Sequence, residues 1–194
     1  MSDASRITRR TLLRGAASLT GALAATTLAT GAAQAATRLG DDGLYTQDWY
    51  VDSFLDLGED LAAATAKKRH FALQWSQRGC IYCKELHTVY FADPALADPI
   101  RAAFDIVHLD LFGAREVTAF DGTRLTEKAF GQHERIRATP TFQFFVLDGG
   151  TAKEVARLPG LLPQKEFAAM FRYVAEGAYK DGTFDAFLAR RNRT

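Results

Sequence analysis

The chain has 194 residues, of which 47% are hydrophobic and 24% are charged, as in an ordinary globular protein. This length suffices for one domain whose core is stable without disulfides or structural metals, so the two cysteines need not hold the fold together. The formal net charge is +1, and no dense basic run lies beyond the N-terminus, which argues against binding to nucleic acid.

The first 35 residues have the pattern of an export signal. Arg9 and Arg10 form a basic pair, a moderately apolar stretch follows, and Ala33-Gln34-Ala35 has the small-x-small pattern that signal peptidases cleave. The paired arginines resemble a twin-arginine signal, with Leu12 where that signal more often has Phe; an ordinary secretory signal is the alternative. We therefore expect a cleaved signal over residues 1–35 and a periplasmic mature protein.

Helices and strands alternate in the first half of the remaining chain. Residues 36–50 are expected to form a polar N-terminal extension, irregular to about Asp48, and residues 51–194 a single domain. A helix over roughly Asp52–Lys67 is predicted because four apolar residues recur at helical spacing: Phe54, Leu57, Leu61 and Ala64. The elements predicted next are a strand at 71–75, a helix at 80–91, a helix at 94–103 that Pro99 interrupts, and a buried strand at 104–111.

The second half of the chain combines two turn signals with further helices. Asp121-Gly122 indicates a hairpin turn, and Leu125–His133 is predicted as a short helix capped by Thr126. The elements predicted after it are a strand at 141–147, a turn at 148–150, a returning strand at 153–158, a helix from Pro163 and a final helix at 184–190. An early β-α-β order with a late hairpin implies a mixed α/β sheet with helices on both faces.

Two cysteines, Cys80 and Cys83, stand three residues apart at the start of a predicted helix. At this spacing both side chains project from nearly the same face, within reach of a disulfide. The free amide groups and the dipole at the helix start stabilise a thiolate at Cys80, which makes it the nucleophile. Cys83, one turn deeper, would then resolve the mixed disulfide. The pattern predicts redox exchange through this pair.

Other uses of the pair fit the sequence less well than redox exchange. A structural disulfide that closes so short a loop removes little entropy from the unfolded chain. The four histidines do not pair at ligand spacing, although copper relay by the two thiolates and a histidine such as His87 remains an alternative. Covalent haem attachment needs a histidine directly after the second cysteine, where the chain has Lys84. We expect no resident metal and no cofactor besides the cysteine pair.

The strand, the CxxC motif at a helix start and the later Ala138-Thr139-Pro140-Thr141 segment resemble the thioredoxin superfamily. The resemblance covers about Phe54 to Ala178 and implies the thioredoxin fold, with a mixed central sheet and helices on both faces. It also implies that Pro140 follows a cis bond and that the Thr139–Pro140 loop presents its backbone to a substrate. Tyr82, between the cysteines, adds an aromatic surface beside the sulfurs and is a further candidate for substrate contact.

A closer likeness is to the periplasmic SoxW-type thioredoxins that accompany bacterial sulfur oxidation, carried by residues 75–86, 138–141 and 172–174. It implies a reductase that a membrane electron donor of the CcdA/DsbD kind keeps reduced. The chain lacks the histidine that strongly oxidising relatives carry between their cysteines, which favours reduction of disulfides in periplasmic partner proteins. A disulfide-forming oxidase is the alternative. Nothing in the sequence requires more than a monomer.

One departure from thioredoxins concerns proton handling. Gln74 stands where thioredoxins have a buried aspartate, and a carboxamide does not exchange protons at physiological pH. Another group must then take the proton of Cys83. His108, on one side of its strand with Ile106 and Asp110, is the candidate.

Overall fold

A computed structural model describes residues 37–191 of the chain. The predicted export signal, residues 1–35, therefore lies outside the described residues. Within residues 37–191, no helix is both long and apolar enough to cross a membrane.

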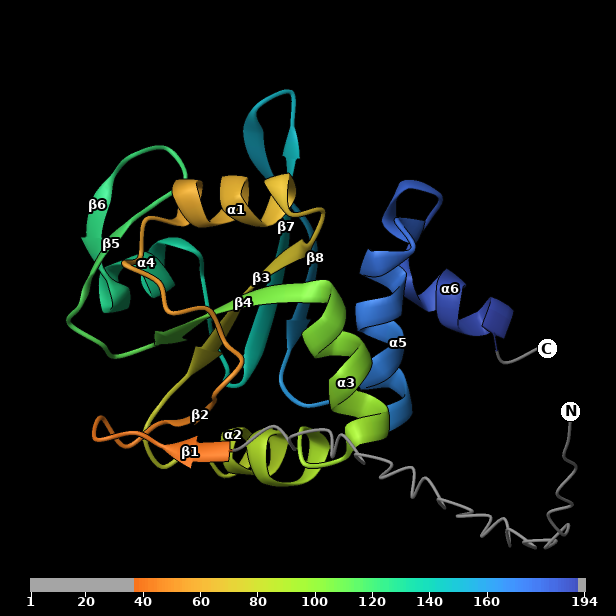
Figure 1. Cartoon of the computed structure of the whole chain (residues 1–194), viewed down its shortest axis with the longest axis horizontal. Coiled ribbons are helices and arrows are strands. Elements are labelled where there is room, and N and C mark those ends of the chain that lie inside the picture. The colour runs from red at the N-terminus through yellow and green to blue at the C-terminus, as the bar shows by residue number, and fades with distance from the viewer. Residues whose placement is uncertain (1–36, 192–194) are drawn as a thin grey trace, which may run out of the picture. The chain divides into compact units, whose positions relative to one another are not determined.

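The centre of the fold is a four-stranded sheet in the order β4-β3-β7-β8 (Figure 1). Its strands are β3 (His70–Ser76), β4 (Phe104–Asp110), β7 (Thr141–Asp148) and β8 (Thr151–Pro159). β3 runs parallel to β4 and antiparallel to β7, and β8 returns antiparallel to β7. The prediction of a mixed sheet with a late hairpin is confirmed.

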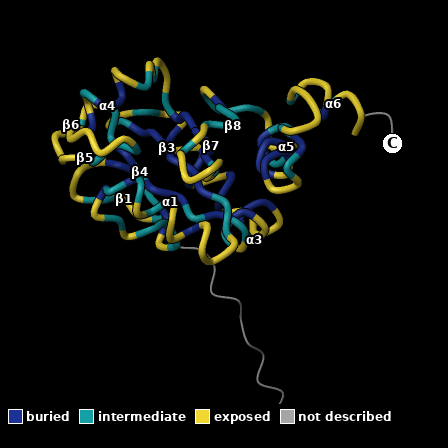
Figure 2. The backbone as a smooth tube through the Cα atoms, turned by 90° about the horizontal axis from the view of Figure 1, so that it is seen from above, coloured by how far each residue is buried: buried dark blue, intermediate teal, exposed yellow. Residues whose placement is uncertain are grey.

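Helices cover both faces of this sheet, as predicted (Figure 1). One face carries α2 (Ile81–Glu85), the π-helical turn η1 (Leu86–Tyr90), α3 (Pro94–Ala103) and α5 (Gln164–Ala175). The other carries α1 (Leu57–Ala66) and α4 (Glu127–His133), and the chain ends in η2 (Ala178–Lys180) and α6 (Phe184–Arg191). Figure 2 shows that the buried segments lie in the sheet and on the inner sides of the helices.

The two faces have different cores. Under α3 and α5, aromatic rings pack edge to face with centroids 5.0–5.9 Å apart; these are Phe104, Phe142, Phe144, Phe167 and Phe171. Under α1 and α4 the core is largely aliphatic, with Trp75 packed on Phe130 at 5.6 Å. Burial of such large apolar side chains is the main source of the fold's stability.

A short hairpin replaces the irregular stretch that was predicted before Asp48. β1 (Thr37–Leu39) pairs antiparallel with β2 (Tyr45–Gln47). The prediction was wrong because neither three-residue strand has a hydrophobic pattern of its own. The hairpin is instead tied to the rest of the domain by Thr37 and Gln47, which bond to the backbone of η1.

Three other boundaries differ from the sequence-based expectation. α1 begins at Leu57 because Asp56 caps it by accepting a hydrogen bond from the Glu59 amide, and Phe54 lies outside the helix, fully exposed at 103%. Pro99 does not interrupt α3. Leu125 belongs to the hairpin of β5 (Glu116–Thr118) and β6 (Arg124–Thr126), whose turn at 121–122 was predicted, and Thr126 caps α4 as predicted.

Candidate active site

The cysteine pair lies at the start of α2, directly after the loop that follows β3. Cys80 is the residue that caps α2, and its Sγ accepts a hydrogen bond from the Cys83 amide at 3.0 Å. A disulfide joins the two residues, with Cα atoms 5.2 Å apart. Cys80 is partly exposed, whereas Cys83 is only 1% exposed. A partner can therefore reach the first sulfur while the second stays inside.

The Thr139–Pro140 segment lies against Cys80, and its peptide bond is cis, as the resemblance implied. The Thr139 hydroxyl donates to Cys80 Sγ at 3.3 Å. The Thr139 carbonyl oxygen lies 3.4 Å from the same sulfur and can accept a hydrogen bond once Cys80 is a thiol. The structure thus brings Cys80 and the predicted substrate-contacting loop together, while the substrate role of Thr139 and Pro140 stays a prediction.

Exposed apolar side chains directly follow the reachable sulfur in the chain. Ile81 and Tyr82 form the first turn of α2, and more than half of each side chain is exposed. Phe112, in the loop after β4, is equally exposed. Exposed apolar surface of this kind is typical of a binding site, and it fits the substrate contact predicted for Tyr82.

Four polar residues gather around η1, two of them buried and two partly buried, and we call them the histidine cluster: Gln47, Tyr50, His87 and His108. His87 follows Cys83 by one helical turn and is fully buried. The ring centroids of Tyr50 lie 5.7 Å from His87 and 5.8 Å from His108, and the two histidine rings are 6.0 Å apart. Gln47 Nε2 lies 3.2 Å from His87 Nδ1; because an amide nitrogen only donates, Nδ1 accepts and the His87 proton resides on Nε2.

Burial keeps both histidines of the cluster uncharged. Burial, helped by neighbouring His108, lowers the pKa of His87 to about 3. Burial and the Arg115 guanidinium lower the pKa of His108 to about 4, against an opposing effect of Asp42. Within residues 37–191, neither histidine Nε2 nor the Tyr50 hydroxyl has a hydrogen-bond partner.

The structure places His108 in this cluster, with Tyr50 and His87 as its ring neighbours, and its role in proton transfer stays a prediction. Gln74 stands beside it in the sheet, paired in register with His108, and is fully buried. Gln74 Nε2 donates to the Trp75 carbonyl at 3.0 Å. Sequence reasoning missed Gln47 and Tyr50 because both fall in the segment taken for an N-terminal extension.

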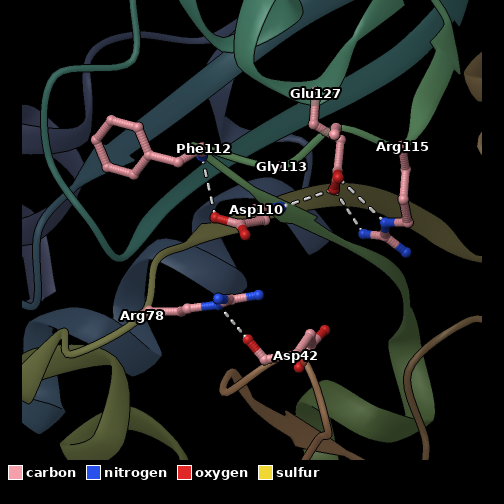
Figure 3. A pocket seen from close by; sticks show the side chains of 8 residues that line it. Asp42, Arg78, Asp110, Phe112, Gly113, Arg115 and Glu127 are labelled. Atoms are coloured by element: carbon pink, nitrogen blue, oxygen red, sulfur yellow. Dashed lines mark hydrogen bonds and ion pairs between the residues drawn. The ribbon is translucent and has the colours of Figure 1, made fainter.

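A pocket of about 440 Å³ opens at the ends of β3 and β4 (Figure 3). Its wall includes Glu127, which is 1% exposed and accepts from the Asp110 amide at 2.8 Å. Arg115 donates to both Glu127 oxygens, at 3.1 and 2.6 Å, and this contact raises the pKa of Arg115. We call Asp110, Arg115 and Glu127 the Glu127 network. It fixes the loop that forms one side of the pocket.

Within residues 37–191, no three side chains of His, Cys, Asp or Glu are grouped so that they could hold a metal ion.

The chain is similar to known proteins in sequence and in structure. The family described as "Thioredoxin-like domain" matches residues 57–175. Among solved structures, the chain is similar to a thioredoxin-fold protein from Helicobacter pylori, with 21% identity, a TM-score of 0.50 and coverage of 71% of this chain and 91% of that one. It is also similar to a thioredoxin from Thermus thermophilus, with 28% identity, a TM-score of 0.48 and coverage of 61% and 83%. No curated protein matches the chain.

Proposed function

This chain belongs to the thioredoxin-like domain family and is a thiol–disulfide oxidoreductase, and from that premise we propose that it reduces disulfide bonds of exported partner proteins. The observation that carries the proposal is the asymmetry of the pair. Cys80 is reachable and receives hydrogen bonds from the Cys83 amide and the Thr139 hydroxyl, whereas Cys83 is buried directly behind it. Donors aimed at one sulfur stabilise it as a thiolate.

The reaction proceeds in two exchanges. In the reduced protein the Cys80 thiolate attacks one sulfur of the partner's disulfide, which forms a mixed disulfide and releases the other partner sulfur as a thiolate. Cys83 then loses its proton and attacks Cys80, which breaks the mixed disulfide and releases the second partner thiol. The partner gains two electrons and the protein is left with the Cys80–Cys83 disulfide.

The surface around Cys80 would hold the partner during these steps. The loop at Thr139 and Pro140 presents its backbone to an extended segment of the partner, and Tyr82 supplies an apolar contact beside the sulfur. Both lie next to Cys80 in sequence or in space, which supports the assignment.

Features of the sequence support the direction and setting that we propose. The residues between the cysteines are Ile81 and Tyr82, so the pair lacks the histidine of strongly oxidising relatives, which supports reduction. The signal pattern in residues 1–35 supports work in the periplasm. The likeness of residues 75–86 to SoxW-type proteins supports a place beside a sulfur-oxidation system, with electrons from a membrane protein of the CcdA/DsbD kind.

Trapping of partners tests the roles of the two cysteines. Cys83→Ser should accumulate partners as mixed disulfides on Cys80, because the second exchange is blocked, and Cys80→Ser is the matched control that should trap none. Partners caught on Cys83 in the control variant would reverse the roles.

Titration of the pair against glutathione tests the direction. Potentials in this superfamily run from about −270 mV for thioredoxin to about −120 mV for DsbA, and we expect a value in the reducing half. A value near the DsbA end would replace the reductase by a disulfide-forming oxidase.

A further inference from the structure

The pocket at the ends of β3 and β4 is lined by charged side chains, and three of them form no ion pair among the residues that the structure describes (Figure 3). Arg78 extends into it, and its Nε donates to the backbone carbonyl of Asp42 at 2.5 Å. Among the residues that the structure describes, the Arg78 guanidinium forms no ion pair, so its terminal N–H groups are available to a ligand. In the same part of the chain, the carboxylates of Asp42 and Asp110 form no ion pair either.

The remaining charges of the pocket are already neutralised. Arg115 and Glu127 bond to each other, so the unpaired charges are one guanidinium and two carboxylates. Each of the two carboxylates accepts one backbone hydrogen bond through Oδ1, from Leu44 for Asp42 and from Phe112 for Asp110. A molecule that complements such a pocket carries a carboxylate for Arg78 and an ammonium group for the two aspartates.

The pocket is formed before any ligand arrives. Glu127 holds the loop after β4, and Gly113 lies against it so closely that a Cβ at this position would come within 2.0 Å of Glu127 Oε2. A loop fixed in this way loses little entropy when a ligand binds. The volume, about 440 Å³, is that of a site for a small molecule.

One residue that lines the pocket, Arg78, is close to Cys80 in the chain. Only Gly79 separates Arg78 from Cys80, so their Cα atoms are at most about 7 Å apart. In cystine, the disulfide of the amino acid cysteine, each sulfur is joined through one methylene to a carbon that carries both an ammonium and a carboxylate. The exposed Phe112 ring at the pocket offers apolar contact to that methylene and its sulfur.

We propose that this pocket binds the α-amino-acid group of a low-molecular-weight disulfide, with cystine as the simplest member of the class, and presents its sulfur to Cys80. The inference rests on the proposed disulfide reduction and adds a substrate class to it. The Cys80 thiolate attacks one cystine sulfur and releases one cysteine, and Cys83 then attacks Cys80 and releases the second. The reduced pair supplies both electrons, and the protein ends as the Cys80–Cys83 disulfide.

Four disulfides that share the S–S–CH2 unit and carry different charged groups test this inference on the pre-reduced full chain. Cystine carries both charged groups, cystamine only the amines, dithiodipropionate only the carboxylates, and hydroxyethyl disulfide neither. Each rate of protein oxidation is divided by the rate of the same disulfide with dithiothreitol, which removes intrinsic reactivity. We expect the corrected rate for cystine to exceed that of the other three about tenfold, the effect of one good charge-assisted contact.

Variants locate the effect in the pocket. Arg78→Gln should lower the ratio of the cystine rate to the hydroxyethyl disulfide rate about tenfold, and Asp110→Asn should lower it in the same direction. Lys84→Gln removes an exposed positive charge on α2 that does not line the pocket, and should leave this ratio unchanged.

The results that would overturn the inference are distinct from those that would overturn the proposed function. Equal corrected rates for all four disulfides, or equal losses in the Arg78 and Lys84 variants, would show that the pocket does not select an amino-acid group. Failure of every disulfide, hydroxyethyl disulfide included, to oxidise the pre-reduced chain would remove the proposed function itself.

Discussion

Two groups of polar residues meet at the end of strand β4, and they differ in how completely their hydrogen bonds are satisfied. In the Glu127 network, both carboxylate oxygens receive donors from Arg115, and one also receives the Asp110 amide. In the histidine cluster, two ring nitrogens and the Tyr50 hydroxyl have no protein partner among residues 37–191. The groups are nevertheless adjacent, since Arg115 also donates to the His108 carbonyl at 3.0 Å.

The difference in hydrogen bonding indicates different roles for the Glu127 network and the histidine cluster. A buried charge with all its partners fixes its surroundings. Buried neutral imidazoles with nitrogens that lack a protein partner cost stability and leave room for a polar ligand such as a water molecule. The first group shapes the pocket, and the second includes His87, which follows Cys83 by one helical turn.

The largest expected effect is from Glu127→Ala. Loss of this carboxylate leaves the Asp110 amide and Arg115 without their partner and should lower the free energy of unfolding by about 2–3 kcal/mol, below the full cost of a broken buried pair because Arg115 is half exposed. Denaturant unfolding measures it. Glu116→Ala is the control: it breaks an ion pair with Arg124 that is exposed on both sides, and should cost at most about 0.5 kcal/mol. Equal losses would contradict the contrast drawn above.

Acid should lower the free energy of unfolding through the two histidines of the histidine cluster. The pKa values of about 3 for His87 and about 4 for His108 lie below the ordinary value of 6.5, so between about pH 6.5 and 3 the unfolded chain binds more protons than the folded one. The free energy of unfolding should therefore be fully retained above pH 6.5 and fall as the pH drops through this window.

Unfolding curves at a series of pH values measure this dependence. The double variant His87→Phe with His108→Phe should flatten the slope, while His133→Gln, at an exposed position, should keep it. A slope that persists in the double variant would assign the acid sensitivity to other groups.

A smaller effect is expected where the hairpin meets the cluster. Gln47→Leu removes the donor to His87 Nδ1 and to the His87 carbonyl, and should lower the free energy of unfolding by about 1–2 kcal/mol. The exposed neighbour Asp48 provides the control, Asp48→Ala, which should stay within about 0.5 kcal/mol. If both variants unfold alike, the contact between the hairpin and η1 contributes nothing to stability.

The smallest effect lies outside both groups. Phe54→Ser should change the free energy of unfolding by less than about 0.5 kcal/mol, because the side chain is fully exposed. Leu57→Ala, three residues on and fully buried, should cost about 2–4 kcal/mol in the same measurement. A large loss at Phe54 would restore its predicted place in the core.

The sequence predicted those parts of the fold that have a periodic pattern or a local signal. The strands of the sheet, the Thr126 cap and the turn at 121–122 each follow from residues close together in the chain. Phe54 was misplaced because spacing alone cannot show that Asp56 caps the helix and so excludes the residues before it.

In the candidate site, too, the sequence predicted the features with a local signal and missed those that depend on distant contacts. The CxxC motif and the Thr139–Pro140 loop could be recognised from a few residues each, since their chemistry is tied to spacing. Gln47 and Tyr50 could not, because their contacts with His87 span 40 and 37 positions of the chain and arise only when the hairpin packs on η1. The unpaired charges of the pocket likewise come from three separate segments of the chain: the β1–β2 turn, the loop before α2 and the end of β4.

The turn η1 has one more consequence. Its backbone bond from the Phe91 amide to the Leu86 carbonyl spans five residues, one more than an ordinary helix uses. Each residue of an ordinary helix rotates the chain by about 100°, so the added residue resets the angle of everything that follows. Tyr90 and Phe91 both point inward, while Thr88 and Val89 point outward. An insertion or deletion here would therefore act as a rotation, carrying aromatic rings out of the core, whereas the same change in a loop would only alter its length.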